Sequence, residues 1–135
     1  MSSKIIEIEG IGAKYAEKFV SANVRTVEEL LQVGSSKAGR EKLATQTGID
    51  EKRILSFCNM ADLFRIKGVG SEFAELLEAA GVDTVKELRN RVAENLHAKL
   101  VEVNNGKNLV RQVPSLSQVK DFIAQAQQLD PVLTH

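Results

Sequence analysis

The chain contains one short pattern twice, and this repetition restricts its possible folds more than any other feature. Residues 8–31 align with residues 66–89 at a constant offset of 66 − 8 = 58 positions. Identities at so many positions indicate an internal duplication, which predicts two homologous structural units. The identical pairs are Ile8/Ile66, Gly10/Gly68, Gly12/Gly70, Ala16/Ala74, Glu17/Glu75, Ala22/Ala80, Val24/Val82, Thr26/Thr84, Val27/Val85, Glu29/Glu87 and Leu30/Leu88.

Both copies have a helical pattern. Apolar residues recur at helical spacing after each glycine pair. The first predicted helix ends at Asn23 and its counterpart at Gly81, two residue types that tolerate a left-handed backbone. A threonine follows each helix, with a glutamate three positions later, and this pattern predicts a capping box at the start of another short helix. The two boxes are Thr26 with Glu29 and Thr84 with Glu87.

The remainder of the first copy predicts two more helices. One spans about 37–45, and Gly48 is the residue expected to terminate it. The next begins behind Asp50, a residue type that caps helices, and its apolar residues continue as far as the second glycine turn. We therefore expect a long helix to join the two copies.

The remainder of the second copy also predicts helices. One spans about 95–103 and is followed by a polar loop at 104–108, which reads NNGKN. Pro114 and Ser115 then open a last helix, and Gln118 completes a third capping box with Ser115.

These patterns predict an all-α fold. Residues 4–8, KIIEI, alternate weakly and are the only candidate for extended structure, but five residues alone cannot form a sheet. Each copy leaves apolar faces to cover, and no Pro/Gly/Ser-rich linker separates the copies. We therefore predict a single domain over 1–135 in which two repeats, about 4–65 and 66–130, pack into one pseudo-symmetric core.

The first glycine turn has the composition of an anion site. Gly10-Ile11-Gly12 leads into a helix expected to begin near Ala13. Glycine lets another molecule approach the backbone closely, and the first N–H groups of a helix lack partners within the helix. The helix dipole adds partial positive charge, so such a turn suits a phosphate. Lys14 is expected to lie beside the bound anion.

The sequence GIGAKYAEKF closely resembles the helix-hairpin-helix motif, and AGVDTVKEL is similar to helix-hairpin-helix domains such as the C-terminal domain of the RNA polymerase alpha subunit. Nearly the whole chain resembles an uncharacterised, mainly bacterial family of tandem helix-hairpin-helix proteins, classed as a domain of unknown function. The resemblance implies tandem helix-hairpin-helix repeats. It also implies that the backbone N–H groups of the turn bind a DNA backbone phosphate without reading base sequence.

The two turns differ in charge. Glu72 stands where the first copy has Lys14, and it places negative charge at the helix start where a phosphate would bind. The second turn, Gly68-Val69-Gly70, is therefore interpreted as structural. Affinity for nucleic acid grows with the number of phosphates neutralised, so the first turn needs additional cations. The candidates are Lys18, Lys37 and Arg40, if the fold brings them to one face.

The composition excludes several other classes of function. Lysine plus arginine and aspartate plus glutamate both total 18, so the chain has no overall positive field to attract nucleic acid. The single cysteine, Cys58, lies among apolar residues and excludes an intramolecular disulfide. No catalytic grouping, metal-ligand cluster or nucleotide-binding loop is visible, so we expect neither an enzyme nor a cofactor or metal. No segment is long and apolar enough to span a membrane, and a cytoplasmic protein is expected.

Three hypotheses remain for the function. The first is a non-enzymatic module that binds nucleic-acid backbone phosphate weakly and without sequence specificity, by the N–H groups of Gly10, Ile11 and Gly12 with help from Lys14. Duplex DNA is the candidate partner. The second is a protein-interaction or assembly module that has lost DNA binding; near-zero net charge and few aromatic residues favour it. The third is an ion or phosphorylated metabolite held at the first glycine turn.

Overall fold

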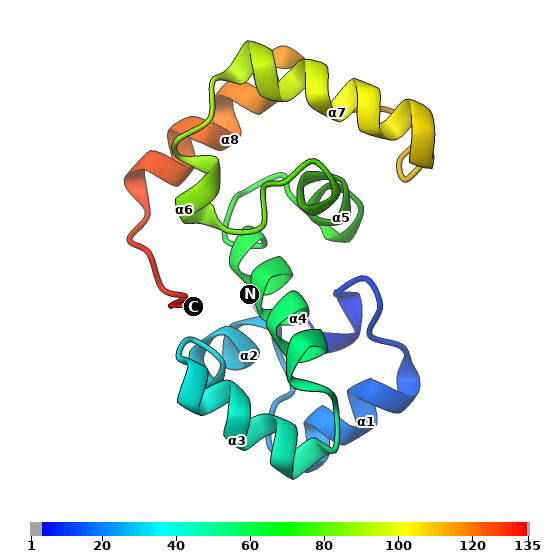
Figure 1. The fold of residues 1–135 in the computed structure, drawn as a ribbon, viewed down its shortest axis with the longest axis vertical. Helices are drawn as coiled ribbons and strands as arrows, with labels where there is room; N and C mark the ends of the chain where they lie inside the picture. The colour runs from blue at the N-terminus through cyan, green and yellow to red at the C-terminus, as the bar shows by residue number, and fades with distance from the viewer. Residues whose placement is uncertain (1–3, 135) are drawn as a thin grey trace. The chain divides into compact units, whose positions relative to one another are not determined.

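The computed structural model describes residues 4–134 (Figure 1). The secondary structure in these residues consists of helices, and they contain no β-strand. The predicted all-α fold is therefore confirmed for this part of the chain. The elements are a short 3-10 helix η1 (Ile5–Glu7) and the α-helices α1 (Ala13–Ser21), α2 (Val27–Val33), α3 (Lys37–Thr47), α4 (Glu51–Leu63), α5 (Ser71–Ala79), α6 (Val85–Leu88), α7 (Ala93–Lys107) and α8 (Leu116–Gln128).

The chain divides into two compact units. Unit 1 consists of the described residues 4–62 together with 132–134, and unit 2 of residues 63–131. Unit 1 thus contains η1 and α1–α3 with nearly all of α4, and unit 2 contains α5–α8. That the two repeats share one pseudo-symmetric core stays a prediction.

Unit 1 has a core of aliphatic and aromatic side chains taken from each of its α-helices. α1 contributes Phe19, α2 contributes Leu30, α3 contributes Leu43 and α4 contributes Ile54, and all four are buried. Thr26 caps α2 as expected: its hydroxyl accepts from the Glu29 N–H at 3.1 Å. These caps and apolar stripes explain why the segments are helical and where each helix begins.

Unit 2 repeats the arrangement with its own core. Leu77 of α5, Leu88 of α6, Leu100 of α7 and Val119 of α8 are buried. α8 begins at the predicted capping box, in which the Ser115 hydroxyl accepts from the N–H of the third helical residue at 3.1 Å.

The two units correspond bond by bond around their first helices. The Val24 N–H donates to the Phe19 carbonyl at 2.8 Å, and at the offset of 58 the Val82 N–H donates to the Leu77 carbonyl at 2.8 Å. Asn23 and Gly81 occupy the left-handed region at these two helix ends, with φ of 66° and 94°. The expected left-handed helix ends are therefore confirmed.

The correspondence extends to α4 and α8, which the sequence alignment did not relate. Phe57 is the seventh residue of α4, and Phe122 is the seventh residue of α8. Both are buried, and each lies against the first glycine of the turn in its own unit, Gly10 or Gly68. The offset here is 122 − 57 = 65, seven more than in the first helices.

Residues 5–7, the weak candidate for extended structure, form the 3-10 helix η1, and the glutamate that ends it accepts from the Lys4 N–H at 2.6 Å. Two local predictions were wrong. The polar loop at 104–108 belongs mostly to α7, because Asn108 adopts a left-handed conformation (φ 51°) and ends the helix there.

The second correction concerns the capping box of α6. The Thr84 hydroxyl accepts from the Glu87 N–H at 3.2 Å, as predicted. The Glu87 carboxylate, however, does not reach back to the cap and instead forms an ion pair with Arg91 at 3.1 Å. The nearby guanidinium, four residues along the chain, offers that carboxylate a charged donor in place of a backbone N–H.

Candidate functional site

The first glycine turn is fixed by the buried side chain at its centre. Ile11 is 3% exposed, and its N–H donates to the Ile8 carbonyl at 3.0 Å. Gly10 has a φ of +92°, and a Cβ there would lie 3.2 Å from Cε1 of Phe57. Glycine is needed at this position because of both the backbone angle and the ring beneath it. The N–H of Ile11, which was predicted to donate to a ligand, donates within the turn in this structure.

The second glycine of the turn faces open space. Gly12 is exposed in an extended conformation with φ of −83°, and a Cβ there would have no atom within 4 Å. It is the N-cap of α1, and without a side chain it cannot accept a hydrogen bond from the first N–H groups of the helix. Among the described residues no acceptor is found for the N–H groups of Gly12 and Ala13. These donors are therefore available to an anion that approaches the start of α1.

Cationic groups lie near this turn, on and beside α1. Lys14 is exposed in the first turn of α1. The Tyr15 ring has two cations over it: the Lys18 Nζ lies 6.0 Å and the Arg53 Cζ 5.7 Å from the ring centroid. Tyr15 is itself held against Phe57, with the ring centroids 5.9 Å apart. α4 thus brings a third cation beside α1.

The sequence patterns did not single out Arg53, which is exposed and yet lies over the Tyr15 ring. The signal that would have identified it is the spacing between Arg53 and Phe57, one helical turn apart on α4. Phe57 packs under the glycine turn, so the residue four positions earlier lies on the same face of that helix.

Two other predicted cations do not join the turn. Lys37 is the first residue of α3, and Figure 1 shows the start of α3 (cyan) and the start of α1 (blue) on opposite sides of unit 1. Arg40 is 2% exposed, and its guanidinium donates to the carbonyl of Gly34 at 2.8 Å and to that of Thr134 at 2.7 Å. Of the predicted cations, Lys14 lies in the first turn of α1, and Lys18 lies in its last turn with its ammonium over the Tyr15 ring.

The second turn has the same backbone and different surroundings. The Val69 N–H donates to the Ile66 carbonyl at 3.1 Å, and Gly68 has a φ of +96° over the Phe122 ring. Gly70 is open, as its counterpart is. The residue that follows in the first helical turn is the exposed Glu72, whose negative charge compensates the dipole of α5.

A glutamine side chain further clamps the second turn. The Gln125 amide accepts from the Lys67 N–H at 2.8 Å and donates to the Lys67 carbonyl at 3.0 Å. In the first unit the residue at the same place in α4 is Met60, which has no such amide. The backbone before Gly68 is therefore satisfied from within unit 2, and its turn lacks the cation that the first turn has.

Other kinds of site find no support in the described residues. Burial raises the pKa of the Cys58 thiol to about 12, even though the positive charge of Arg40 opposes the shift. No group of three histidine, cysteine, aspartate or glutamate side chains is placed to hold a metal ion in residues 4–134. Within the same residues, no helix has the length and apolar character needed to cross a membrane.

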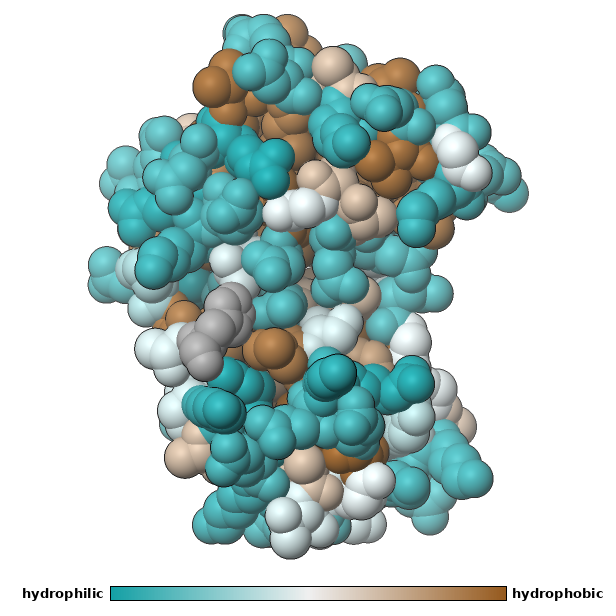
Figure 2. Space-filling view, in the orientation of Figure 1, coloured by the Kyte–Doolittle hydropathy of each residue, from teal (hydrophilic) through white to brown (hydrophobic). Residues whose placement is uncertain are grey.

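The exposed apolar side chains do not form one continuous surface in view. On the face shown in Figure 2, hydrophobic residues occupy small areas separated by hydrophilic ones. The large apolar residues with substantial exposure are Ile6, Val20, Val33, Val92, Val101 and Val132. Apolar residues scattered in this way are normal on a protein surface.

Comparison with known proteins adds one relation. The model of a family described as a domain of unknown function, DUF4332, matches residues 9–129. No curated protein and no solved structure matches the chain.

Proposed function

Because the chain belongs to the DUF4332 family, a domain of unknown function, we propose a role from its own residues: a non-enzymatic helix-hairpin-helix module that binds nucleic-acid backbone phosphate. The phosphate is held at the start of α1 by the N–H groups of Gly12 and Ala13, with Lys14 beside it. The bound nucleic acid is duplex DNA, and its base sequence is not read.

The observation that carries this proposal is the open second glycine. A phosphate oxygen needs close access to backbone N–H groups, and a Cβ on Gly12 would meet no atom of the protein within 4 Å. The space in front of this residue is therefore free for a ligand. The exposed Lys14 and the pair of cations on the Tyr15 ring, Lys18 and Arg53, supply positive charge on the same helix and its neighbour α4.

The same residues imply weak binding. The exposed acids Glu9 and Glu17 flank these cations, and Glu72 takes the place of the lysine at the second turn. With two or three phosphates neutralised, the logarithm of the affinity should fall with the logarithm of the salt concentration with a slope of roughly −2 to −3. Contacts confined to the phosphates position a duplex without specifying its sequence.

Fluorescence anisotropy with a labelled 20-base-pair duplex tests the proposal, at salt concentrations rising from about 20 mM. The Lys14→Gln variant should bind more weakly and reduce the salt slope by about 1, because one phosphate contact is lost. Lys99→Gln is the matched control, since Lys99 is exposed in the middle of α7 and far along the chain from the glycine turn. Two duplexes of unrelated sequence should bind equally.

A reverse substitution sharpens the test. Glu72→Lys gives the second turn the cation found in the first, and it should increase both the affinity and the salt slope. Absence of binding at the lowest salt, or equal loss in Lys14→Gln and Lys99→Gln, would refute the proposal.

A further inference from the structure

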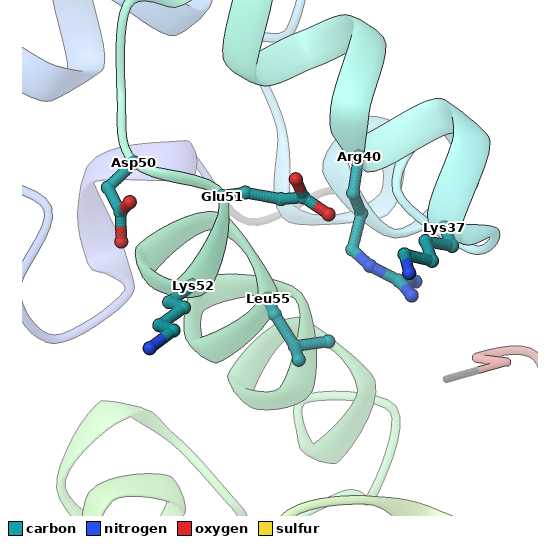
Figure 3. Close-up of a pocket in the computed structure, with 6 residues that line it drawn as sticks. All are labelled: Lys37, Arg40, Asp50, Glu51, Lys52 and Leu55. Carbon is teal, nitrogen blue, oxygen red and sulfur yellow. The ribbon is translucent and has the colours of Figure 1, made fainter.

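A separate pocket lies in unit 1, where α3 and α4 begin (Figure 3). Its volume is about 380 Å³, which falls within the range of about 300–1,000 Å³ that small-molecule sites occupy. The residues that line it are Lys37, Arg40, Asp50, Glu51, Lys52 and Leu55. Three of these side chains are cationic and two are anionic, so the lining carries a net positive charge.

Arg40 forms the buried part of this lining. Only 2% of its surface is exposed, and its two hydrogen bonds go to uncharged carbonyls, those of Gly34 and Thr134. In residues 4–134 no carboxylate oxygen forms an ion pair with it within 4.0 Å. A guanidinium has five N–H donors, so two bonds leave it capacity for more. A buried charge without a counter-ion is costly, and an anion beside it would lower that cost.

The ionisable side chain behind Arg40 does not supply the missing negative charge. Cys58 is fully buried. Its Sγ and the Arg40 side chain both lie next to Gly34, because a Cβ on that glycine would meet both of them. Burial raises the pKa of Cys58 to about 12, so the thiol stays neutral at physiological pH. An anion bound in the pocket would compensate the charge of Arg40.

Figure 3 shows how the charged groups divide the pocket. The nitrogen atoms of Lys37 and Arg40 point to the same side of α3, and the Glu51 carboxylate points toward Arg40 from the start of α4. A fully ionised anion placed between them would be attracted by the two cations and repelled by Glu51. A ligand that presents hydroxyl groups to that carboxylate converts the repulsion into hydrogen bonds.

We propose that this pocket binds a small hydroxyl-bearing phosphomonoester, with its phosphate against Lys37 and Arg40 and a hydroxyl group donating to Glu51. The apolar side chain of Leu55 provides the floor for the carbon skeleton. The pocket does not involve the glycine turn, so the inference stands apart from the proposed binding of nucleic acid.

Titration of the ¹⁵N-labelled full chain with glucose 6-phosphate tests the proposal. Amide signals at the starts of α3 and α4 should shift and saturate. Sodium sulfate at equal ionic strength should bind more weakly, because sulfate has no hydroxyl group to donate to Glu51. Lys37→Glu should weaken the binding of glucose 6-phosphate by about tenfold or more, as expected when a charge-assisted hydrogen bond is replaced by repulsion. Lys37 is exposed, so the variant should keep its fold.

Two further variants make the result decisive. Lys42→Glu is the matched control, because Lys42 is exposed on the same helix but does not line the pocket. The affinity of this variant for glucose 6-phosphate should stay near that of the natural chain. Glu51→Gln should reduce the preference for glucose 6-phosphate over sulfate. Equal weakening by Lys37→Glu and Lys42→Glu, or equal affinity for sulfate and glucose 6-phosphate, would overturn the proposal. Saturable shifts confined to the start of α1 would assign the ligand to the glycine turn and also overturn it.

Discussion

Replacing the glycines of the two turns by alanine, one at a time, should separate residues that the fold requires from residues that only a ligand requires. Gly10 and Gly68 have φ angles of +92° and +96°, which residues with a Cβ rarely adopt. A Cβ at these positions would lie 3.2 Å from Cε1 of Phe57 and 3.1 Å from Cε1 of Phe122, respectively. Each first glycine therefore meets both a backbone and a packing restriction.

The expected loss can be estimated from these two restrictions. A positive φ costs a residue with a side chain about 1–2 kcal/mol. Moving a packed ring by a few tenths of an ångström adds about 1 kcal/mol, the lower end of the cost of overpacking. Gly10→Ala and Gly68→Ala should each lower the free energy of unfolding by about 2–3 kcal/mol, a large fraction of the stability of a small domain.

The second glycines should behave differently. Gly12 and Gly70 have negative φ angles of −83° and −100°, and both face open space. Alanine there restricts the unfolded chain, which stabilises by about 0.4–1 kcal/mol. Alanine is also a poorer N-cap than glycine, by a similar amount. The two effects nearly cancel, so the free energy of unfolding should change by less than about 0.5 kcal/mol.

Urea denaturation followed by circular dichroism measures all four variants, and unchanged m-values would show that the unfolded state is not altered. A loss in Gly12→Ala as large as that in Gly10→Ala would refute the reasoning, because the space around the second glycine would then not be open. If the first turn binds phosphate, Gly12→Ala should also weaken duplex binding in a protein of natural stability, and Gly70→Ala should not.

Two further predictions concern caps and burial. Backbone N–H groups, that of Arg25 first and then that of Thr26, hold the pKa of Glu29 below its ordinary value of 4.5. This contribution to stability is present above pH 4.5 and is lost as the pH falls through the lowered pKa. Glu29→Gln removes the titrating group, so its free energy of unfolding should fall less than that of the natural chain between about pH 5 and pH 3. Urea midpoints measured at a series of acidic pH values test this. Cys58, whose pKa is raised to about 12 by burial, should react with an aromatic disulfide reagent at pH 8 only in denaturant, and fast reaction in the native protein would contradict its burial.

Local sequence signals predicted much of the fold. The ends of α1 and α3 follow from residues in left-handed conformations, Asn23 and Gly48. The start of α8 follows from Ser115 and its capping box. These features depend on a few neighbouring residues and on the backbone angles that each residue type allows, so they can be read without knowing the tertiary contacts.

Tertiary packing decides what the sequence did not predict. Glu87 matches the capping pattern as well as Glu29 does, but its carboxylate forms an ion pair with Arg91, whereas the Glu29 carboxylate accepts from the Thr26 N–H. Arg40 was expected at the surface as a cation and is buried against carbonyl groups, one of them 94 positions along the chain. No pattern within a helix predicts a contact with so distant a segment.

The alignment of the two repeats also could not predict which aromatic residue packs under each glycine turn. Phe57 and Phe122 occupy the same position in their helices, but the offset between the copies changes from 58 to 65 before those helices begin. An alignment with a constant offset therefore stops before it reaches them. The contact that fixes the turn, and with it the position of Arg53 beside Tyr15, is visible only in three dimensions.

The segment 132–134 gives unit 1 an unusual order of assembly. The Thr134 N–H donates to the Ser35 carbonyl at 2.9 Å, and the Thr134 carbonyl accepts from Arg40. A ribosome completes all of unit 2 before it adds these residues, so Arg40 gains this acceptor only after unit 2 has been synthesised. A fragment ending at Asp62 would lack that acceptor, so cutting the chain between the two units removes one of the two hydrogen bonds of the Arg40 guanidinium.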